Sequence, residues 1–205
     1  IITIIIKIFL LIYIILYLIS NLNIMSVFNK EHYNSGDGML TAVWGPPMWH
    51  SLHTISFNYP VNPSKEQKDN YYQYFKSLEH VLPCRYCREN YKENLKTLKF
   101  SKTHFKDRDS LSRFVYKLHE MVNKNLGKKS GLSFTQVRDR YENFRARCLN
   151  DDSKNTPIVK ESKIEKGCTD PLYGVKSKCV MNIVPKSSKK ETLTINEKCK
   201  IKNKK

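Results

Sequence analysis

Five segments between residues 44 and 148 repeat apolar side chains at the spacing of an α-helix, and this pattern limits the fold more than any other feature. Apolar residues three or four positions apart share one face of a helix, whereas a half-buried strand alternates apolar and polar residues. No segment of the chain shows sustained alternation of that kind. We therefore expect an all-α protein, in which a four-helix up-and-down bundle is followed by a short fifth helix.

Capping residues mark where these helices begin and end. Ser64 and Ser133 are each followed three residues later by Gln, which is the pattern of a capping box at a helix N-terminus. The first helix is expected after the break at Pro46–Pro47, and the fourth is expected to begin near Asp109. Gly127 is expected to close the fourth helix, because glycine adopts the left-handed conformation that often follows a helix.

The segments that flank the helical region differ from it in composition. Residues 1–20 are a nearly unbroken apolar run, long enough for a membrane-spanning anchor. Because the first methionine is Met25, translated sequence upstream of the true start explains the same run equally well. Residues 21–43 have the composition of a linker, and residues 149–205 are basic and predicted to be largely disordered. One island of that tail, residues 168–184, contains more apolar side chains.

The chain is strongly basic, with 36 Lys plus Arg against 19 Asp plus Glu and a formal net charge of +17. Such a balance favours acidic partners. However, the lysines are spread through the chain and concentrated after Cys148, with no Arg-rich helix and no nucleic-acid-binding motif. Nucleic acid is therefore not expected as a partner, although a basic interaction module stays open as an alternative.

The sharpest local feature is the run Pro83-Cys84-Arg85-Tyr86-Cys87-Arg88. Two cysteines three positions apart at a helix start can close a small disulfide ring, and the helix N-terminus and the two arginines favour a thiolate over a thiol. A thiolate is what thiol–disulfide exchange requires. A helical zinc-binding module is the alternative, but zinc needs two further ligands, and no second CxxC or His pair lies at usable spacing. No metal site is therefore expected.

Two pairs of side chains flank the dithiol in sequence. Trp49 and His53 are one helical turn apart, and so are His119 and Asn123, so each pair projects from one face of its helix. Either pair alone is compatible with a buried aromatic residue beside a satisfied polar neighbour.

Taken together and in this order, the motifs from Trp44 to Cys148 resemble the Erv/ALR family of FAD-linked sulfhydryl oxidases. Three family patterns are matched here, together with the Arg-Trp pair of the family's last helix, which corresponds to Arg140 and Tyr141. The matching residues are Gly45, Trp49 and His53 on the first helix, Cys84 and Cys87 on the third, and His119, Val122, Asn123, Leu126, Gly127 and Lys128 on the fourth.

The resemblance implies an FAD-dependent thiol oxidase that forms disulfides in protein substrates and reduces O2 to H2O2. It implies that Cys84 exchanges with the substrate and that Cys87 faces the flavin, within an FAD-binding domain of residues 44–148. It also implies a homodimer, and it sets no single compartment, because relatives occur in mitochondria, secretory compartments and large DNA viruses. The residues expected to bind FAD are Gly45, Trp49, His53, Tyr59, His119, Val122, Asn123, Leu126, Lys128, Arg140 and Tyr141.

The chain departs from the family at several positions. Glu120 replaces a usual Asn, and Tyr141 replaces Trp, although a phenol ring can still stack on a flat cofactor. Relatives with a structural disulfide between the fourth and fifth helices would place cysteines near Tyr116 and Phe134, where this chain has none. We expect apolar packing there instead.

The tail cysteines are open to two interpretations. Cys168 and Cys179 are predicted either to form a local structural disulfide or to shuttle electrons from the substrate to the CxxC pair, as an additional cysteine pair does in relatives. A link between protomers through Cys148 or Cys199 is a further open alternative.

Overall fold

The computed structural model describes residues 12–15, 17, 30–147, 170–185, 187–188, 190 and 194–200. The chain divides into two compact units, Ile1–Asp37 and Gly38–Lys205. In the first unit the short helix α2 spans Lys30–Tyr33. Most of the apolar run 1–20 lies outside the described residues, so its role as an anchor stays a prediction. Among the helices that are described, none combines the length and the apolar character that a bilayer-spanning helix requires.

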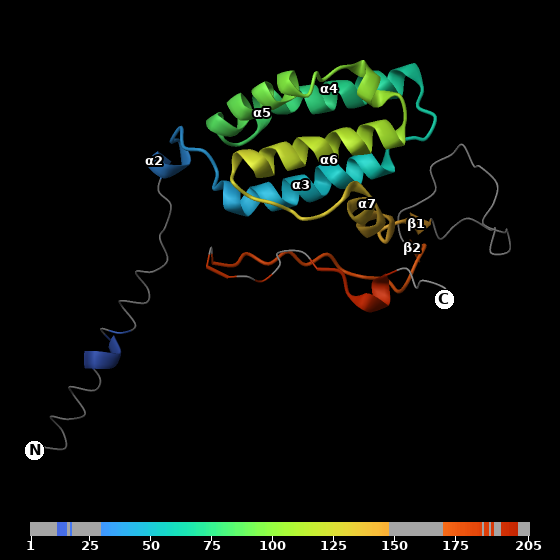
Figure 1. Ribbon diagram of the computed structural model, residues 1–205. Helices are drawn as coiled ribbons and strands as arrows, with labels where there is room; N and C mark the ends of the chain where they lie inside the picture. The colour runs from blue at the N-terminus through green and yellow to red at the C-terminus, as the bar shows by residue number, and fades with distance from the viewer. Residues whose placement is uncertain are drawn as a thin grey trace, which may run out of the picture. The chain divides into compact units, whose positions relative to one another are not determined.

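The second unit is mostly helical, which confirms the predicted class (Figure 1). Helices α3 and α6 lie side by side, as do α4 and α5, and α7 packs against α3 and α6. A two-residue strand β1 pairs antiparallel with β2, which the sequence did not suggest. The elements are α3 (Thr41–Asn58), α4 (Lys65–Val81), α5 (Arg85–Thr97), η1 (Lys102–Phe105), α6 (Arg108–Asn125), α7 (Phe134–Glu142), β1 (Ala146–Arg147), β2 (Asp170–Pro171) and η2 (Glu197–Cys199).

The predicted capping residues are confirmed. Ser64 accepts a hydrogen bond from the Gln67 backbone (3.1 Å), and its own N–H donates to the Gln67 side chain (2.8 Å). Ser133 forms the same box at the start of α7. Gly127 follows α6 with a φ of 65°, a conformation that costs glycine little. Local sequence thus sets these helix ends.

The start of the first long helix was predicted wrongly. Helix α3 begins at Thr41, and Pro46 and Pro47 lie inside it rather than before it. An interior proline loses a backbone hydrogen bond and costs about 3 kcal/mol. The first turn is held by a local bond and by tertiary packing instead. The indole of Trp44 donates to the Met39 carbonyl (3.0 Å), and its ring packs on the core.

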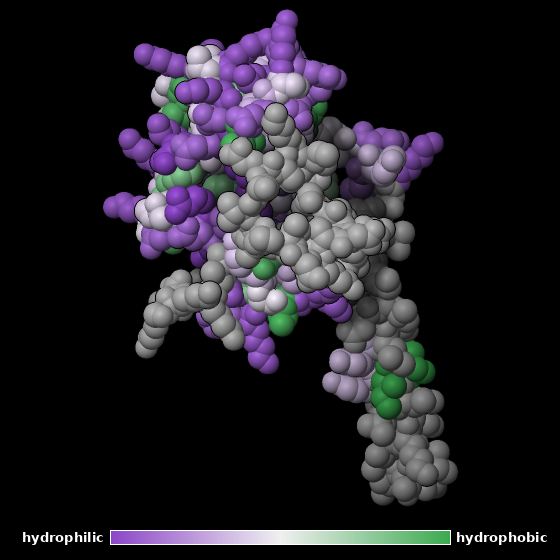
Figure 2. Space-filling model, turned by 90° about the vertical axis from the view of Figure 1, so that its right-hand side faces the viewer, coloured by the Kyte–Doolittle hydropathy of each residue, from purple (hydrophilic) through white to green (hydrophobic). Residues whose placement is uncertain are grey.

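The main core fills the space among α3, α4, α5, α6 and η1. Its buried residues are Leu52, Tyr59, Phe75, Leu78, Leu82, Tyr91, Leu95, Phe105, Leu111, Phe114, Val115 and Leu118. A smaller cluster of Phe57, Val137 and Tyr141 attaches α7 to α3. The face in Figure 2 is mostly hydrophilic over the described residues, as expected when the apolar side chains are largely inside.

Aromatic packing joins α6 to α7. The rings of Tyr116 and Phe134 meet edge to face, with centroids 5.8 Å apart, and the Tyr116 hydroxyl donates to the Leu132 carbonyl (2.8 Å). The expectation that apolar packing occupies the place of a disulfide is therefore confirmed.

Part of the tail is ordered by contacts with itself. The backbone N–H of Val175 donates to the Lys198 carbonyl (3.3 Å). Gly174 has a φ of +68°, and a Cβ at this position would lie 2.6 Å from the same carbonyl oxygen, so only glycine fits. Cys199 is buried at this point, whereas Cys148 and Cys168 lie outside the described residues. The pairing of Cys168 with Cys179 therefore stays a prediction.

Candidate active site

Cys84 and Cys87 lie at the N-terminus of α5. Cys84 is the N-cap residue, and its sulfur accepts a hydrogen bond from the backbone N–H of Cys87 (3.3 Å). Both are free thiols and partly exposed. The predicted position at a helix start is thus confirmed, and the unpaired N–H groups of this first turn favour a negative charge on sulfur.

The two sulfurs are electrostatically unequal. The pKa of Cys84 is lowered, mainly by a hydrogen bond from the Cys87 side chain and then by backbone N–H groups. The pKa of Cys87 is raised, mainly by burial and then by its interaction with Cys84. In the reduced pair, Cys84 is therefore the sulfur that loses its proton more readily.

The neighbouring arginines act differently from each other. The positive charge of Arg88 lowers the pKa of Cys87, although burial outweighs it. Arg85 instead pairs with Glu89 (3.3 Å) and lies over the Tyr86 ring, 4.4 Å from its centroid. Only Arg88 therefore has the role that was expected of both.

A second cluster combines aromatic and imidazole rings from α3, α6 and α7. The rings of Trp49 and His119 stack with centroids 4.1 Å apart and an interplanar angle of 5°. His53 Nε2 lies 3.0 Å from His119 Nδ1, and the ring of Tyr141 lies 5.2 Å from that of His53. Four of the predicted cofactor-binding residues are therefore brought together.

Both imidazoles of this cluster are held neutral. Burial lowers the pKa of His53 to about 3, with a further contribution from His119, and burial lowers the pKa of His119 to about 4. His53 is 4 % exposed, and its Nδ1 is buried with no hydrogen-bond partner among the described residues. A buried orphan nitrogen beside stacked rings fits a flat heteroaromatic cofactor that supplies the missing hydrogen bond.

The other predicted residues lie at the ends of these helices. Asn123 donates to Glu120 (3.1 Å), so the glutamate that departs from the family pattern orients this amide. The backbone N–H of Lys128 donates to the Asn123 carbonyl (2.8 Å), which holds the exposed lysine beside the end of α6. Gly45, Val122 and Arg140 are partly exposed, and Leu126 is exposed.

Tyr59 does not belong to this cluster. It is 0 % exposed, its hydroxyl donates to the Phe105 carbonyl (2.9 Å), and its ring meets that of Tyr71 edge to face. Its expected contact with FAD stays a prediction, which this position in the main core does not support.

His50 was missed by the sequence analysis. Its Nδ1 lies 3.3 Å from the Tyr141 hydroxyl, and its ring meets that of Phe144 edge to face. His50 is next to Trp49 in the chain, but only the position of α7 shows that it faces Tyr141.

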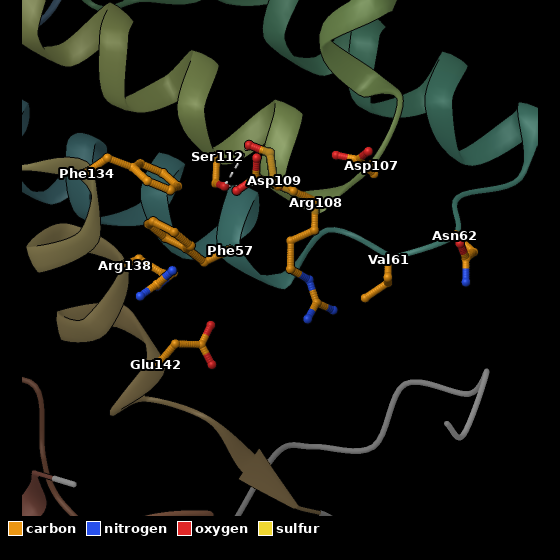
Figure 3. Close-up of a pocket in the computed structure, with 10 residues that line it drawn as sticks. All are labelled: Phe57, Val61, Asn62, Asp107, Arg108, Asp109, Ser112, Phe134, Arg138 and Glu142. Carbon is orange, nitrogen blue, oxygen red and sulfur yellow. Dashed lines mark hydrogen bonds between the residues drawn. The ribbon is translucent and has the colours of Figure 1, made fainter. Parts of the chain in front are cut away.

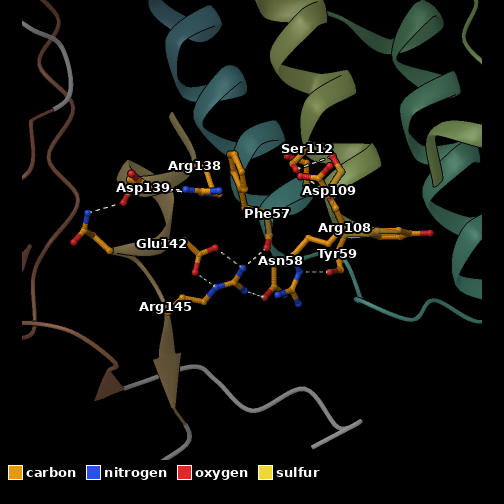
Figure 4. Close-up of polar contacts among 12 residues, drawn as sticks. Phe57, Asn58, Tyr59, Arg108, Asp109, Ser112, Arg138, Asp139, Glu142 and Arg145 are labelled. Carbon is orange, nitrogen blue, oxygen red and sulfur yellow. Dashed lines mark hydrogen bonds and ion pairs between the residues drawn. The ribbon is translucent and has the colours of Figure 1, made fainter. Parts of the chain in front are cut away.

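Arg145, just beyond α7, was also missed. Its guanidinium donates to the Phe57 carbonyl, to Asn58 and to both carboxylate oxygens of Glu142 (Figure 4). Because Phe57 stacks on Tyr141 with centroids 5.3 Å apart, these bonds fix the end of α7 and the ring that it carries.

A cavity of about 420 Å³ lies beyond this stack (Figure 3). Its walls combine the two rings of Phe57 and Phe134 with charged side chains, among them Arg108, Arg138 and Glu142. Along α3, Phe57 is about 24 Å from Thr41, which contacts Cys87, at 1.5 Å per residue. The cavity is therefore remote from the sulfurs. Within the described residues, no group of three or more His, Cys, Asp or Glu could hold a metal ion.

Comparison with known proteins relates the helical unit to one family. Residues 46–142 match the family described as Erv1 / Alr. Over 86 residues the chain is 36% identical to "probable FAD-linked sulfhydryl oxidase R368" of Acanthamoeba polyphaga mimivirus, covering 42% of this chain and 60% of that protein. Over 84 residues it is 29% identical to the mitochondrial FAD-linked sulfhydryl oxidase ERV1 of Saccharomyces cerevisiae, covering 41% and 43%. The chain thus spans less than two thirds of either relative.

Among solved structures, the chain is similar to the FAD binding domain of Erv1 from Saccharomyces cerevisiae. The identity is 26%, with 50% of this chain and 94% of that chain covered and a TM-score of 0.45.

Proposed function

From the match of residues 46–142 to the Erv1 / Alr family, we propose that the chain belongs to this family and is an FAD-dependent thiol oxidase. The observation that carries the proposal is the structure of the dithiol. Cys84 caps α5, its pKa is lowered, and Cys87 lies three residues on with its sulfur packed against the core. Such an oxidase needs a dithiol that can exchange with thiols and, in the same unit, a site for a flat cofactor. The cluster of aromatic and imidazole rings fits the second requirement.

The proposed domain comprises residues 44–148. Helices α3, α4, α5 and α6 form its four-helix up-and-down bundle, and α7 is the short fifth helix. The pairing of α3 with α6 and of α4 with α5 supports this arrangement. The basic tail that follows is an appendage, in which Cys168 and Cys179 are predicted either to form a local disulfide or to shuttle electrons from the substrate.

The proposed FAD site lies on the ring cluster. Trp49, His53, His119 and Tyr141 would hold the flat part of the cofactor, and Asn123 and Lys128 would hold its polar part. When bound, FAD would accept two electrons from the dithiol and pass them to O2, giving H2O2. The orphan Nδ1 of His53 and the neutral state of both imidazoles support this assignment.

The proposed substrates are protein thiols. A substrate thiolate attacks Cys84 of the Cys84–Cys87 disulfide, the sulfur–sulfur bond breaks, and Cys87 leaves with the electron pair. Attack at Cys84 is favoured because its sulfur is partly exposed at the helix start, whereas Cys87 packs against the core. The functional unit is proposed to be a homodimer.

Oxygen consumption with dithiothreitol tests the function. The purified wild-type protein loaded with FAD should consume oxygen and release H2O2, and Cys87→Ser should abolish both. Cys179→Ser is the matched control, because Cys179 is an exposed thiol in the tail and a small dithiol needs no relay. A wild-type protein that neither binds FAD nor consumes oxygen would overturn the proposal.

A further inference from the structure

The segment that precedes α3 is fixed to the turn that carries the cysteines. The backbone N–H of Met39 donates to the Pro83 carbonyl (2.9 Å). A Cβ on Gly38 would lie 3.0 Å from that carbonyl oxygen and 3.4 Å from Cys84 Cα, so the backbones approach closely where the side chain is absent. The Trp44 indole bond to Met39 holds the same segment from the other side.

This attachment places Thr41 beside the sulfur of Cys87. Thr41 is the first residue of α3, and its Oγ1 lies 3.8 Å from Cys87 Sγ, within hydrogen-bonding distance for sulfur. The residues are 46 positions apart in the chain, so the contact is tertiary. A hydroxyl is a flexible donor that can turn its proton toward a negative sulfur.

We propose that Thr41 is a catalytic residue of the dithiol site, whose hydroxyl donates a hydrogen bond to Cys87 when exchange at Cys84 releases that sulfur as a thiolate. The inference rests on the proposed function, because it assigns Cys87 as the leaving group. In the step, a bond forms between the substrate sulfur and Cys84, and the Cys84–Cys87 bond breaks. Cys87 keeps the electron pair, Thr41 keeps its proton, and no further reactant is consumed.

The neighbours of Cys87 explain why a donor is needed. Burial and Cys84 raise the pKa of Cys87, whereas the Thr41 hydroxyl and the charge of Arg88 lower it. Once Cys84 is joined to a substrate, its charge and its hydrogen bond no longer act on Cys87. Burial is then the remaining effect that raises the pKa of Cys87, while Thr41 and Arg88 lower it. A leaving thiol of lower pKa leaves faster.

The test measures the pH dependence of Cys87 alkylation by iodoacetamide, quantified by mass spectrometry of the peptide that contains it. The background is Cys84→Ser, which removes the charge of the second sulfur and keeps an N-cap oxygen. In this background Thr41→Val should raise the pKa of Cys87 by about one unit, as loss of a hydrogen bond to a charged group predicts. The rate at pH 7 should fall about threefold, because a tenfold smaller thiolate fraction is partly offset by a stronger nucleophile.

Two further variants make the result specific. Thr41→Ser keeps the hydroxyl and should retain the wild-type profile. Thr54→Val removes a hydroxyl from the same helix that donates only to the His50 carbonyl (2.9 Å), and it should change nothing. An unchanged pH dependence of Cys87 alkylation in Thr41→Val would overturn the inference. A shift of the Cys87 pKa in Thr41→Ser or Thr54→Val as large as in Thr41→Val would overturn it as well. Alkylation needs neither flavin nor oxygen, so absence of FAD binding would defeat the proposed function without deciding this point.

Discussion

The buried histidine pair should make the FAD-free protein sensitive to mild acid. His53 Nε2 and His119 Nδ1 are 3.0 Å apart, so one nitrogen must carry a proton and the other must accept it. A proton on each of these nitrogens would set two donors face to face. Burial lowers the pKa of His53 to about 3 and that of His119 to about 4, while an unfolded histidine titrates near 6.5.

The direction and size of the effect follow from these values. Below pH 6.5 the two histidines become protonated in the unfolded chain but stay neutral in the folded protein. The free energy of unfolding therefore falls as the pH decreases toward 4. Between pH 6.5 and 5, keeping one histidine neutral lowers the free energy of unfolding by about 2 kcal/mol. Keeping both neutral lowers it by up to about 4 kcal/mol. Burial lowers the pKa of His50 as well, which adds in the same direction. The carboxylates with lowered pKa, such as Asp107, lose their contribution mainly below pH 5.

Urea unfolding of the FAD-free protein at pH 7, 6 and 5 measures this loss. The wild-type free energy of unfolding should fall by up to about 4 kcal/mol, and His119→Gln should show about half of that slope. His80→Gln is the control, because the His80 side chain is 72% exposed on α4 and contacts Glu79 (3.0 Å) rather than either histidine of the pair. A flat wild-type profile, or an equal slope in His119→Gln, would refute the account of the pair.

Two further predictions concern the contacts of α7. Arg145→Met removes the bonds to the Phe57 carbonyl and to Glu142; it should destabilise the fold by about 2 kcal/mol and weaken FAD binding, since α7 carries Tyr141. Urea unfolding and FAD titration check both effects, and unchanged values for both would contradict the positioning role. Tyr116→Phe removes only the hydroxyl bond to Leu132 and should cost about 1 kcal/mol with FAD content unchanged, so lost FAD would count against a purely structural contact.

Features that depend on neighbouring residues in the chain were predictable. The capping boxes at Ser64 and Ser133 and the glycine after α6 identify helix ends because the hydrogen bonds involved span only three or four residues. The position of Cys84 and Cys87 at the start of α5 follows from the same local rules. Trp49, His53 and His119 were selected by helical spacing together with the resemblance.

Features that depend on distant residues were not predictable. The start of α3 ahead of two prolines relies on Trp44 being held by the core, and spacing alone cannot show this. Tyr59 and Tyr141 are both tyrosines near helix ends, yet one fills the main core and the other meets His53. The contact of Thr41 with Cys87 joins segments 46 residues apart. Only the contact of Thr41 with Cys87 and the packing of α7 on α3 separate these cases.

The passage of electrons from the Cys84–Cys87 pair to bound FAD is tested most directly without oxygen. The FAD-loaded protein is mixed anaerobically with dithiothreitol, and the visible absorption of oxidised flavin is followed. We predict that this absorption is lost in the wild-type protein and persists in Cys87→Ser. Bleaching at the wild-type rate in Cys87→Ser, or a wild-type flavin that dithiothreitol leaves oxidised, would contradict the account.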